Sequence, residues 1–375
     1  MYLRVVAACL LTTLTLACDG RASERRANGA SPLAPSILAY HKPHHDNSIE
    51  QMGRALQLGF RRIHLVATLF CQLDDAHRVT DYGVIEEGRF TPLDADRLAT
   101  LAAHYREIFA AAKSAHLEVA VTAHLNAWGP RAEWRNHFDF DPLASIGGFS
   151  YANSLIEALV AAHYSNFGSD AWELSVVGEM GGSVFRYPQQ YAQWLQTLKA
   201  DPRNRQLNVG VSLNFNDAAD QLAVSQSQWE QFGQLLQHSD FVGMSLYRPI
   251  ALPVDREHFD EASEQFLRQF DGHGFQRHRE LPLVLSEIGL GGGREGNRPA
   301  STPAEAALAP WEGVVDARRS PWSDPTMQQF RRDFHRALLQ FLEAPRKPLA
   351  VQGAYLWSEG SWDPLDIVDH GFFDA

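Results

Sequence analysis

From residue 36 onward, hydrophobic and polar positions along this chain follow two alternating patterns. Short runs rich in Val, Ile and Leu, typical of buried strands, are separated by longer stretches whose apolar residues recur every three to four positions, as in amphipathic helices. The strand pattern occurs at residues 36–41, 62–70, 117–125, 172–179, 207–215, 240–247, 281–289 and 350–357. The helical pattern occurs at residues 49–59, 94–116, 151–168, 187–200, 228–239, 259–274 and 327–343.

Continuous apolar strands that alternate with helices predict a parallel sheet covered by helices. The count of eight favours a closed (β/α)8 TIM barrel, which we expect to form a single α/β domain over residues 37–375. A dinucleotide-binding sheet would need Gly-x-Gly-x-x-Gly after the first strand, and that motif is missing there. The glycine-rich stretch around Gly293 opens no helix. It is therefore predicted to belong to a long loop, residues 289–323, at the functional end of the barrel.

The N-terminus has the layout of a signal peptide, residues 1–18, with Arg4, an apolar stretch and then Ala17-Cys18. The ending LTLAC resembles a bacterial lipobox with Cys18 as the lipidated residue, and ordinary signal cleavage nearby is the alternative. Residues 19–36 are small, polar and proline-bearing, which predicts a flexible tether. We therefore expect an exported protein, periplasmic or at the cell surface, that contacts the membrane only through an N-terminal lipid anchor.

The net charge limits the possible binding partners of the protein, and the cysteine count limits its possible disulfides. A formal net charge of −12 argues against nucleic acid or an anionic membrane surface as a partner. Of the three cysteines, Cys9 lies in the signal segment and Cys18 would be lipidated, which leaves Cys71 and no disulfide framework. Cys71 has no ligand-like spacing around it and is predicted to be buried packing.

Candidate chemistry lies where the strands end, because the active site of a (β/α)8 barrel is built at the C-terminal ends of its strands. These ends supply Tyr40, His41, Thr68, Phe70, His124, Asn126, Trp128, Glu179, Asn214, Asn216, Tyr247, Glu287 and Trp357. Glu179 and Glu287 end the fourth and seventh strands, which face one another across the mouth. Opposed carboxylates suit glycosidic bond hydrolysis, and at roughly 5–5.5 Å apart one of them attacks the anomeric carbon with retention of configuration.

Four segments together resemble the clan A glycoside hydrolases, which are retaining (β/α)8 enzymes. They are VVGEMGG around Glu179, DFVGMSLYRP containing Tyr247, LPLVLSEIGLGG around Glu287 and AYLW ending at Trp357. Within the clan the texture is closest to glycoside hydrolase family 113, which is associated with β-mannan cleavage. The resemblance implies that Glu179 is the general acid/base and Glu287 the nucleophile. It also implies that Tyr247 hydrogen-bonds the nucleophile and that Trp357 forms the floor of the sugar subsite nearest the cut.

Two positions depart from the pattern of the clan. Gly178 precedes the acid/base, where many members have an Asn that contacts the sugar 2-hydroxyl. Arg61 and Arg62 lie at the start of the second strand, whereas many members have an Arg near its end. On electrostatic grounds we expect apolar neighbours and the charge of Glu287 to raise the pKa of Glu179, and hydrogen bonding to keep Glu287 ionised.

Other strand-end and loop residues are candidates for sugar contacts. The predicted substrate-binding set, besides Tyr247 and Trp357, is His41, His124, Asn126, Trp128 and Asn214. Loop tryptophans 128, 134, 311, 322 and 362 either stack on sugar rings or anchor their loops to the barrel. Asn216, Glu359 and Asp363 are weaker candidates, and Gly181-Gly182 either let a sugar approach the backbone or form a turn.

Two other functions remain open from the sequence. A metal-dependent amidohydrolase could use the cluster His41, His44 and His45, but it would need further His ligands at later strand ends and a carboxylate, usually at strand eight. Strands five and six end in Asn and Tyr, so we expect neither a metal nor another cofactor. A catalytically inactive barrel that binds carbohydrate is the second alternative, although binding alone needs no opposed carboxylates.

Overall fold

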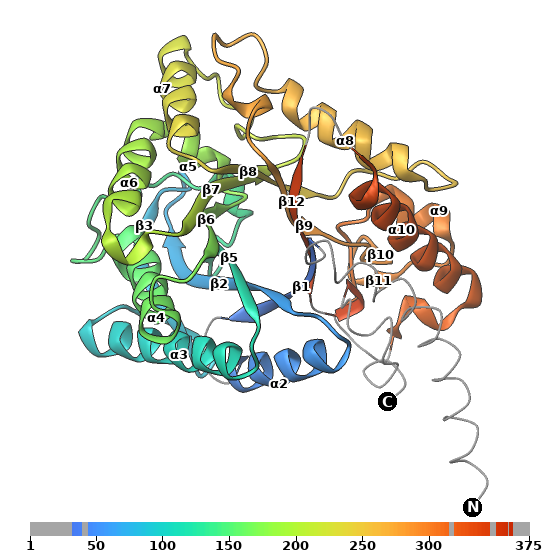
Figure 1. Ribbon diagram of the computed structural model, residues 1–375, viewed down its shortest axis with the longest axis horizontal. Helices are drawn as coiled ribbons and strands as arrows, with labels where there is room; N and C mark the ends of the chain where they lie inside the picture. Colours follow the sequence, from blue (N-terminus) through green and yellow to red (C-terminus); the bar gives the residue numbers. More distant parts are fainter. Residues whose placement is uncertain (1–31, 40–43, 315–318, 346–349, 359, 363–375) are drawn as a thin grey trace, which may run out of the picture. The chain divides into compact units, whose positions relative to one another are not determined.

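The structure is a computed structural model that describes residues 32–39, 44–314, 319–345, 350–358 and 360–362. Eight parallel strands form a closed barrel (Figure 1), in which β1 pairs with both β2 and β12. They are β1 (Leu33–Ala39), β2 (Arg62–Leu73), β5 (Glu118–Ala127), β6 (Trp172–Gly178), β7 (Leu207–Asn214), β8 (Phe241–Leu246), β9 (Leu283–Ile288) and β12 (Val351–Leu356). The predicted (β/α)8 barrel is confirmed.

Helices lie around the outside of the strands (Figure 1). The main ones are α2 (His44–Gln57), α3 (Ala95–Ser114), α4 (Glu157–Phe167), α6 (Pro188–Ala200), α7 (Gln226–Gln237), α8 (Arg256–Arg268) and α10 (Pro325–Glu343). Their starts carry clear sequence signals. Asp94, Asp255 and Asp324 accept hydrogen bonds from first-turn amides, and Ser225 forms a capping box with Gln228. Each of the seven predicted helices is present, with ends that differ by a few residues.

The first strand begins earlier than predicted. It starts at Leu33, so residues 33–36, which we expected to end the tether, belong to the barrel. Prolines 32 and 35 give this stretch the composition of a linker, yet Pro35 aligns with Leu356 of β12 in the barrel. Proline is tolerated near the beginning of a strand because few ladder hydrogen bonds depend on its missing N–H.

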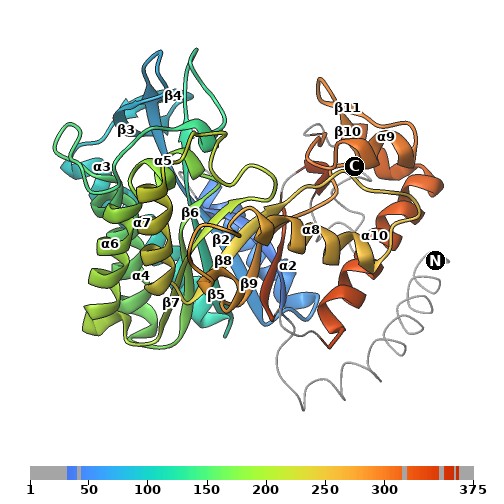
Figure 2. The ribbon, with the colours of Figure 1, turned by 90° about the horizontal axis from the view of Figure 1, so that it is seen from above.

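Two folded segments extend the barrel at its C-terminal end. The hairpin of β3 (Val79–Glu86) and β4 (Arg89–Pro92) continues β2 antiparallel, and the sequence analysis did not predict it. The predicted loop 289–323 contains β10 (Gly293–Arg294), β11 (Arg298–Pro299) and α9 (Pro303–Leu308). Figure 2 shows both segments at the same end of the barrel, on opposite sides of it.

Polar side chains fill the other end of the barrel interior. Glu173 accepts hydrogen bonds from Arg62 Nη2 at 3.1 Å, Gln352 Nε2 at 2.9 Å and the Tyr355 hydroxyl. The His64 ring stacks on Tyr355 with 4.1 Å between centroids. Arg62 therefore belongs to a polar cluster at the N-terminal end of the barrel and not to the strand ends where the candidate catalytic residues lie.

Replacing Glu173 with alanine is expected to lower the free energy of unfolding by about 3–5 kcal/mol, because it leaves Arg62 without its carboxylate in a mostly buried position. Urea denaturation followed by circular dichroism measures the effect. The exposed Glu280, replaced in the same way, is the control and should change stability by less than about 0.5 kcal/mol. Equal stabilities for the two variants would contradict the role given to the cluster.

Several predictions fall outside the described residues. They concern the signal segment with Cys18, the tether up to residue 31, Tyr40, His41, Glu359 and Asp363, and the side chains of His44 and His45. Export and lipidation stay predictions. Cys71 is buried, as expected, and burial raises the pKa of its thiol. In the part of the chain that the structure describes, no helix combines the length and apolar character that crossing a membrane requires.

Candidate active site

The barrel brings Glu179 and Glu287 to one mouth. Glu179 directly follows β6 and Glu287 lies on β9, and their side chains are almost fully buried. Register irregularities precede both residues, in the β6–β7 pairing before Glu179 and in the β8–β9 pairing opposite Glu287. Such irregularities commonly redirect side chains beside active sites.

A guanidinium bridges the two glutamates. Arg135 Nη1 lies 3.0 Å from Glu179 Oε2 and 3.9 Å from Glu287 Oε1. The two carboxylate oxygens are therefore no farther apart than the sum of these distances. That bound admits the spacing of roughly 5–5.5 Å that direct attack by a carboxylate requires.

The backbone of Glu179 is in an unusual conformation. Its φ is +56°, in the left-handed region that residues other than glycine rarely adopt, at a cost of about 1–2 kcal/mol. Its N–H nevertheless donates to the Ser212 carbonyl at 3.0 Å, which ties the residue to β7. Strain of this kind concentrates at functional sites, where surrounding contacts hold it in place.

Four donors hold the carboxylate of Glu179. Trp134 Nε1 donates to Oε2 at 3.3 Å and Arg135 Nη1 donates to the same oxygen at 3.0 Å. Asn214 Nδ2, at 3.1 Å, and the Ser245 hydroxyl donate to Oε1. Hydrogen bonds from donors, one of them a cation, stabilise the ionised form of a carboxylate.

Glu287 has a different environment. Burial raises the pKa of its carboxyl to about 7, against the opposing influence of the Arg135 charge and of the hydrogen bond that the Tyr247 hydroxyl donates. Burial and the negative charge of Glu287 in turn raise the pKa of Tyr247 well above its usual value. The expectation that hydrogen bonding keeps Glu287 ionised is therefore not met: Glu287 retains its proton at higher pH than an ordinary carboxyl, although Tyr247 donates to it.

His124 occupies the space beside the departure at Gly178. A Cβ added at Gly178 would lie 2.4 Å from His124 Nε2, so no side chain fits at that position. The same Nε2 lies 2.9 Å from Glu287 Oε1, and neither atom has an aligned hydrogen bond among the described residues. Burial, with the nearby Arg135 charge, lowers the pKa of His124 well below its usual value, so the ring is neutral.

The loop that carries Arg135 is fixed from its next residue. A short 3-10 turn, Arg135–His137, contains the fully buried Asn136. Asn136 Oδ1 accepts from the Gly181 amide at 2.8 Å and its Nδ2 donates to the Asp217 carbonyl at 2.9 Å. Gly181 and Gly182 open α5 (Gly181–Arg186) and are buried against this loop, so they do not provide an exposed approach for sugar.

The other predicted site residues lie at varying distances from the glutamates. Asn214 reaches Glu179, and Asn126 Oδ1 accepts from Arg135 Nε at 3.2 Å. The ring centroid of Trp357 is 6.0 Å from that of His124. Trp128 is 40% exposed and packs edge-on against Phe70. Asn216 is exposed.

Sequence reasoning missed Arg135 and Ser245. It noted Trp134 only as a loop aromatic. Ser245 lies on β8 two positions before Tyr247, which directly follows that strand, so the alternation of side chains along an extended chain could have identified it. Arg135 carries no such signal, because it lies in a loop whose path depends on contacts with residues distant in the sequence.

The loop tryptophans divide into two groups. Trp128, Trp134 and Trp311 are 40%, 37% and 47% exposed. Trp322 is buried, and its Nε1 donates to the Ser361 carbonyl at 2.7 Å. The ring of Trp362 lies against Gly313, where an added Cβ would clash with it. Trp322 and Trp362 therefore anchor loops.

The fold is similar to that of solved β-mannanases. A complex of a glycoside hydrolase family 113 β-1,4-mannanase matches over 89% of this chain and 90% of its own, with a TM-score of 0.50 and 16% identity. Another family 113 β-1,4-mannanase structure matches over 92% of this chain and 100% of its own, with a TM-score of 0.50 and 14% identity. The chain has the fold of the family 113 mannanases. No family model matches this chain, and no curated protein does.

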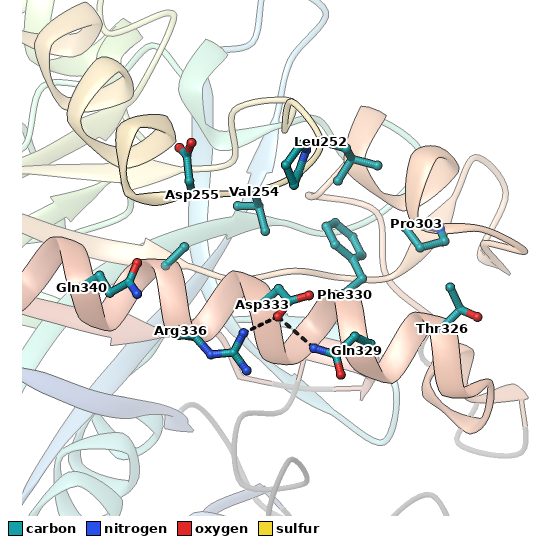
Figure 3. Close-up of a pocket in the computed structure, with 12 residues that line it drawn as sticks. Leu252, Val254, Asp255, Pro303, Thr326, Gln329, Phe330, Asp333, Arg336 and Gln340 are labelled. Carbon is teal, nitrogen blue, oxygen red and sulfur yellow. Dashed lines mark hydrogen bonds and ion pairs between the residues drawn. The ribbon is translucent and has the colours of Figure 1, made fainter.

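Apart from the two glutamates, the described residues form a pocket on the outside of the barrel but no cluster of metal ligands. Among the described residues, no group of three or more His, Cys, Asp or Glu could hold a metal ion. A pocket of about 410 Å³ lies between α10, the 252–255 loop and Pro303 (Figure 3). In its wall Asp333 accepts hydrogen bonds from Gln329 and Arg336. None of the residues that line it is a strand-end candidate.

Proposed function

We propose that this protein is a retaining glycoside hydrolase that cleaves a β-linked polysaccharide or oligosaccharide, with β-mannan as the first substrate to test. The observation that carries the proposal is the pair of buried glutamates on β6 and β9, linked by Arg135 at one barrel mouth. The fold shared with family 113 β-1,4-mannanases supports it.

The proposed reaction uses both carboxyls in turn. Glu287 attacks the anomeric carbon while Glu179 gives a proton to the departing glycosidic oxygen, and a covalent glycosyl-enzyme forms. Glu179 then removes a proton from water, which attacks the same carbon and releases the sugar with retained configuration. The Tyr247 hydroxyl, which donates to Glu287, orients the nucleophile.

The remaining predicted residues would bind the sugar. His124 takes the space that a side chain at Gly178 would need, and its Nε2 and Glu287 Oε1 both lack an aligned partner. These two atoms are 2.9 Å apart, so a sugar hydroxyl placed beside the pair would bond to both, in place of the 2-hydroxyl contact that an Asn makes in many clan members. Trp357 would lie under the sugar ring. Asn126 would hold Arg135 in place and Asn214 would hold Glu179 in place, so both would shape the subsite.

Hydrolysis assays on β-mannan, β-galactan, β-glucan and aryl β-glycosides test the proposal. We expect hydrolysis of at least one substrate, insensitivity to chelators, and a first-formed product with the anomeric configuration of the substrate, as read by NMR. Binding without hydrolysis would favour the inactive carbohydrate-binding barrel. Chelator-sensitive hydrolysis would favour the metal-dependent alternative.

Replacing Trp311 with alanine is expected to raise KM for a polysaccharide about 2- to 10-fold, since an aromatic contact is worth about 0.5–1.5 kcal/mol. Trp311 is 47% exposed on the segment that follows β9. KM for a short aryl glycoside should change less, because this substrate is too short to extend from the glutamates to Trp311. Leu308, 70% exposed on α9, is the matched control, and its alanine variant should behave as wild type. Equal KM values for the two variants on polysaccharide would remove this segment from the substrate site.

A further inference from the structure

Arg135 has an arrangement that the two-glutamate chemistry alone does not explain. Its guanidinium contacts the glutamate proposed as proton donor, at 3.0 Å, more closely than the one proposed as nucleophile, at 3.9 Å. Four donors contact the carboxylate of Glu179 and burial raises the pKa of Glu287, whereas retention requires a protonated Glu179 and an ionised Glu287. The observed contacts therefore favour the wrong partner for the proton.

We propose that Arg135 is a positioning residue that decides which of the two glutamates carries their shared proton, a proposal that rests on the proposed function. With Arg135 on Glu179, the proton is held by Glu287. When a substrate brings its glycosidic oxygen to Glu179 it competes with Trp134 and Arg135 for that carboxylate. Arg135 Nη1 then moves to Glu287, and the proton passes from Glu287 to Glu179.

The anchoring of the loop confines this movement to the side chain. Asn136 holds the adjacent backbone through the Gly181 amide and the Asp217 carbonyl. The guanidinium has a second contact, from Nε to Asn126 Oδ1 at 3.2 Å, about which it can pivot. A displacement of about 1 Å changes which carboxylate lies within hydrogen-bond distance of Nη1.

The groups around Arg135 keep the charge balance simple. Glu179 and Glu287 face it from β6 and β9, His124 from β5, Tyr247 from the end of β8 and Tyr151 from the segment before α4. The histidine pKa is lowered and both tyrosine pKa values are raised, so these three are neutral near pH 7. One guanidinium, one carboxylate and one carboxylic acid remain. Moving the proton leaves their total charge unchanged.

Other charged groups near the loop pair with one another. His137 Nε2 lies 3.7 Å from Asp220 Oδ1, and Arg186 lies within 4 Å of both Asp139 and Asp220. Burial raises the pKa of Asp220, against the positive charges of His137 and Arg186. These residues can therefore titrate as well, but each is paired with another member of the same cluster. The variants that test Arg135 leave all of them in place.

The pH dependence of kcat/KM for Arg135→Gln tests the proposal. Removing the cation raises the pKa of Glu287, which the Arg135 charge lowers, so the acidic limb of the profile should move to higher pH by about one unit or more. Arg135→Lys retains the charge without the forked contacts, and its shift should be smaller. Arg131→Gln, on the same loop but paired with the exposed Asp75, should reproduce the wild-type profile. A profile for Arg135→Gln that superimposes on wild type, or moves to lower pH, overturns the proposal.

A titration without turnover separates this proposal from the proposed function. Glutamate labelled with 13C at Cδ is followed by NMR against pH, and the Glu287 signal is assigned by its loss in Glu287→Gln. Glu287 should titrate at higher pH in Arg135→Gln, or in Arg135→Lys if the former does not fold, than in wild type. Unchanged titration overturns the role of Arg135. Absence of hydrolysis by wild type, with the shift present, overturns only the glycoside hydrolase assignment.

Discussion

Replacing Glu287 with glutamine is expected to lower kcat/KM for any glycoside substrate on the order of 10⁴-fold or more, because no other group can form the covalent intermediate. Glutamine has the same shape and can still accept from Tyr247, so substrate binding should persist. Steady-state kinetics on the best substrate, together with a binding assay, would measure both. Glu280→Gln, an exposed change just before β9, is the control and should retain wild-type rates.

Glu287→Gln should also be more stable than wild type at neutral and alkaline pH. Burial raises the pKa of Glu287 to about 7 from a usual 4.5, so the folded state binds more protons than the unfolded state between these values. The free energy of unfolding of wild type therefore falls as pH rises through this window, by up to about 3 kcal/mol. The glutamine variant lacks this loss, so the two proteins should converge below pH 4.5. Hydrolysis that survives in Glu287→Gln would remove Glu287 from the mechanism, whatever its stability.

The strands and the glutamates could be predicted because their signals are local. A strand buried on both faces must be continuously apolar, and the chemistry of a barrel must lie where such strands end. Glu179 and Glu287 meet both conditions within a few residues of sequence. The β3–β4 hairpin escaped prediction because its partly buried strands mix polar and apolar residues around a turn, and the start of β1 because two prolines made it resemble a tether.

The electrostatics of the site could not be predicted, because they depend on tertiary contacts. Arg135 reaches the glutamates only because Asn136 binds Gly181 and Asp217, which are 45 and 81 positions away in sequence. The raised pKa of Glu287 comes chiefly from burial, which no short stretch of sequence specifies. From the sequence, Gly178 predicts the loss of a sugar contact, whereas in the structure the His124 ring fills the space that a side chain at Gly178 would occupy. The space at Gly178 is thus filled by a residue from a neighbouring strand, β5.

Replacing Glu179 with glutamine should separate its role from that of Glu287. A general acid contributes about 10²–10⁴-fold, and it is needed only when the leaving oxygen must be protonated. We expect kcat/KM on polysaccharide to fall by that range, and formation of the glycosyl-enzyme from an aryl glycoside with an acidic phenol to fall far less. The amide oxygen can still accept from Asn214 and Ser245, so the fold should be retained.

Azide provides the decisive measurement on the same variant. It needs no general base, so it should accelerate breakdown of the glycosyl-enzyme in Glu179→Gln and yield a β-glycosyl azide, whereas it should not rescue Glu287→Gln. Glu118, an exposed carboxylate at the start of β5, provides the matched control. Glu118→Gln should hydrolyse both substrates at wild-type rates, and azide should not change those rates. Equal losses on polysaccharide and on activated glycoside, without azide rescue, would contradict an acid/base role for Glu179. Rescue of Glu287→Gln that yields the β-glycosyl azide would instead mean that the two glutamates have the opposite roles, because direct attack by azide in a variant that lacks the nucleophile gives the inverted α-glycosyl azide.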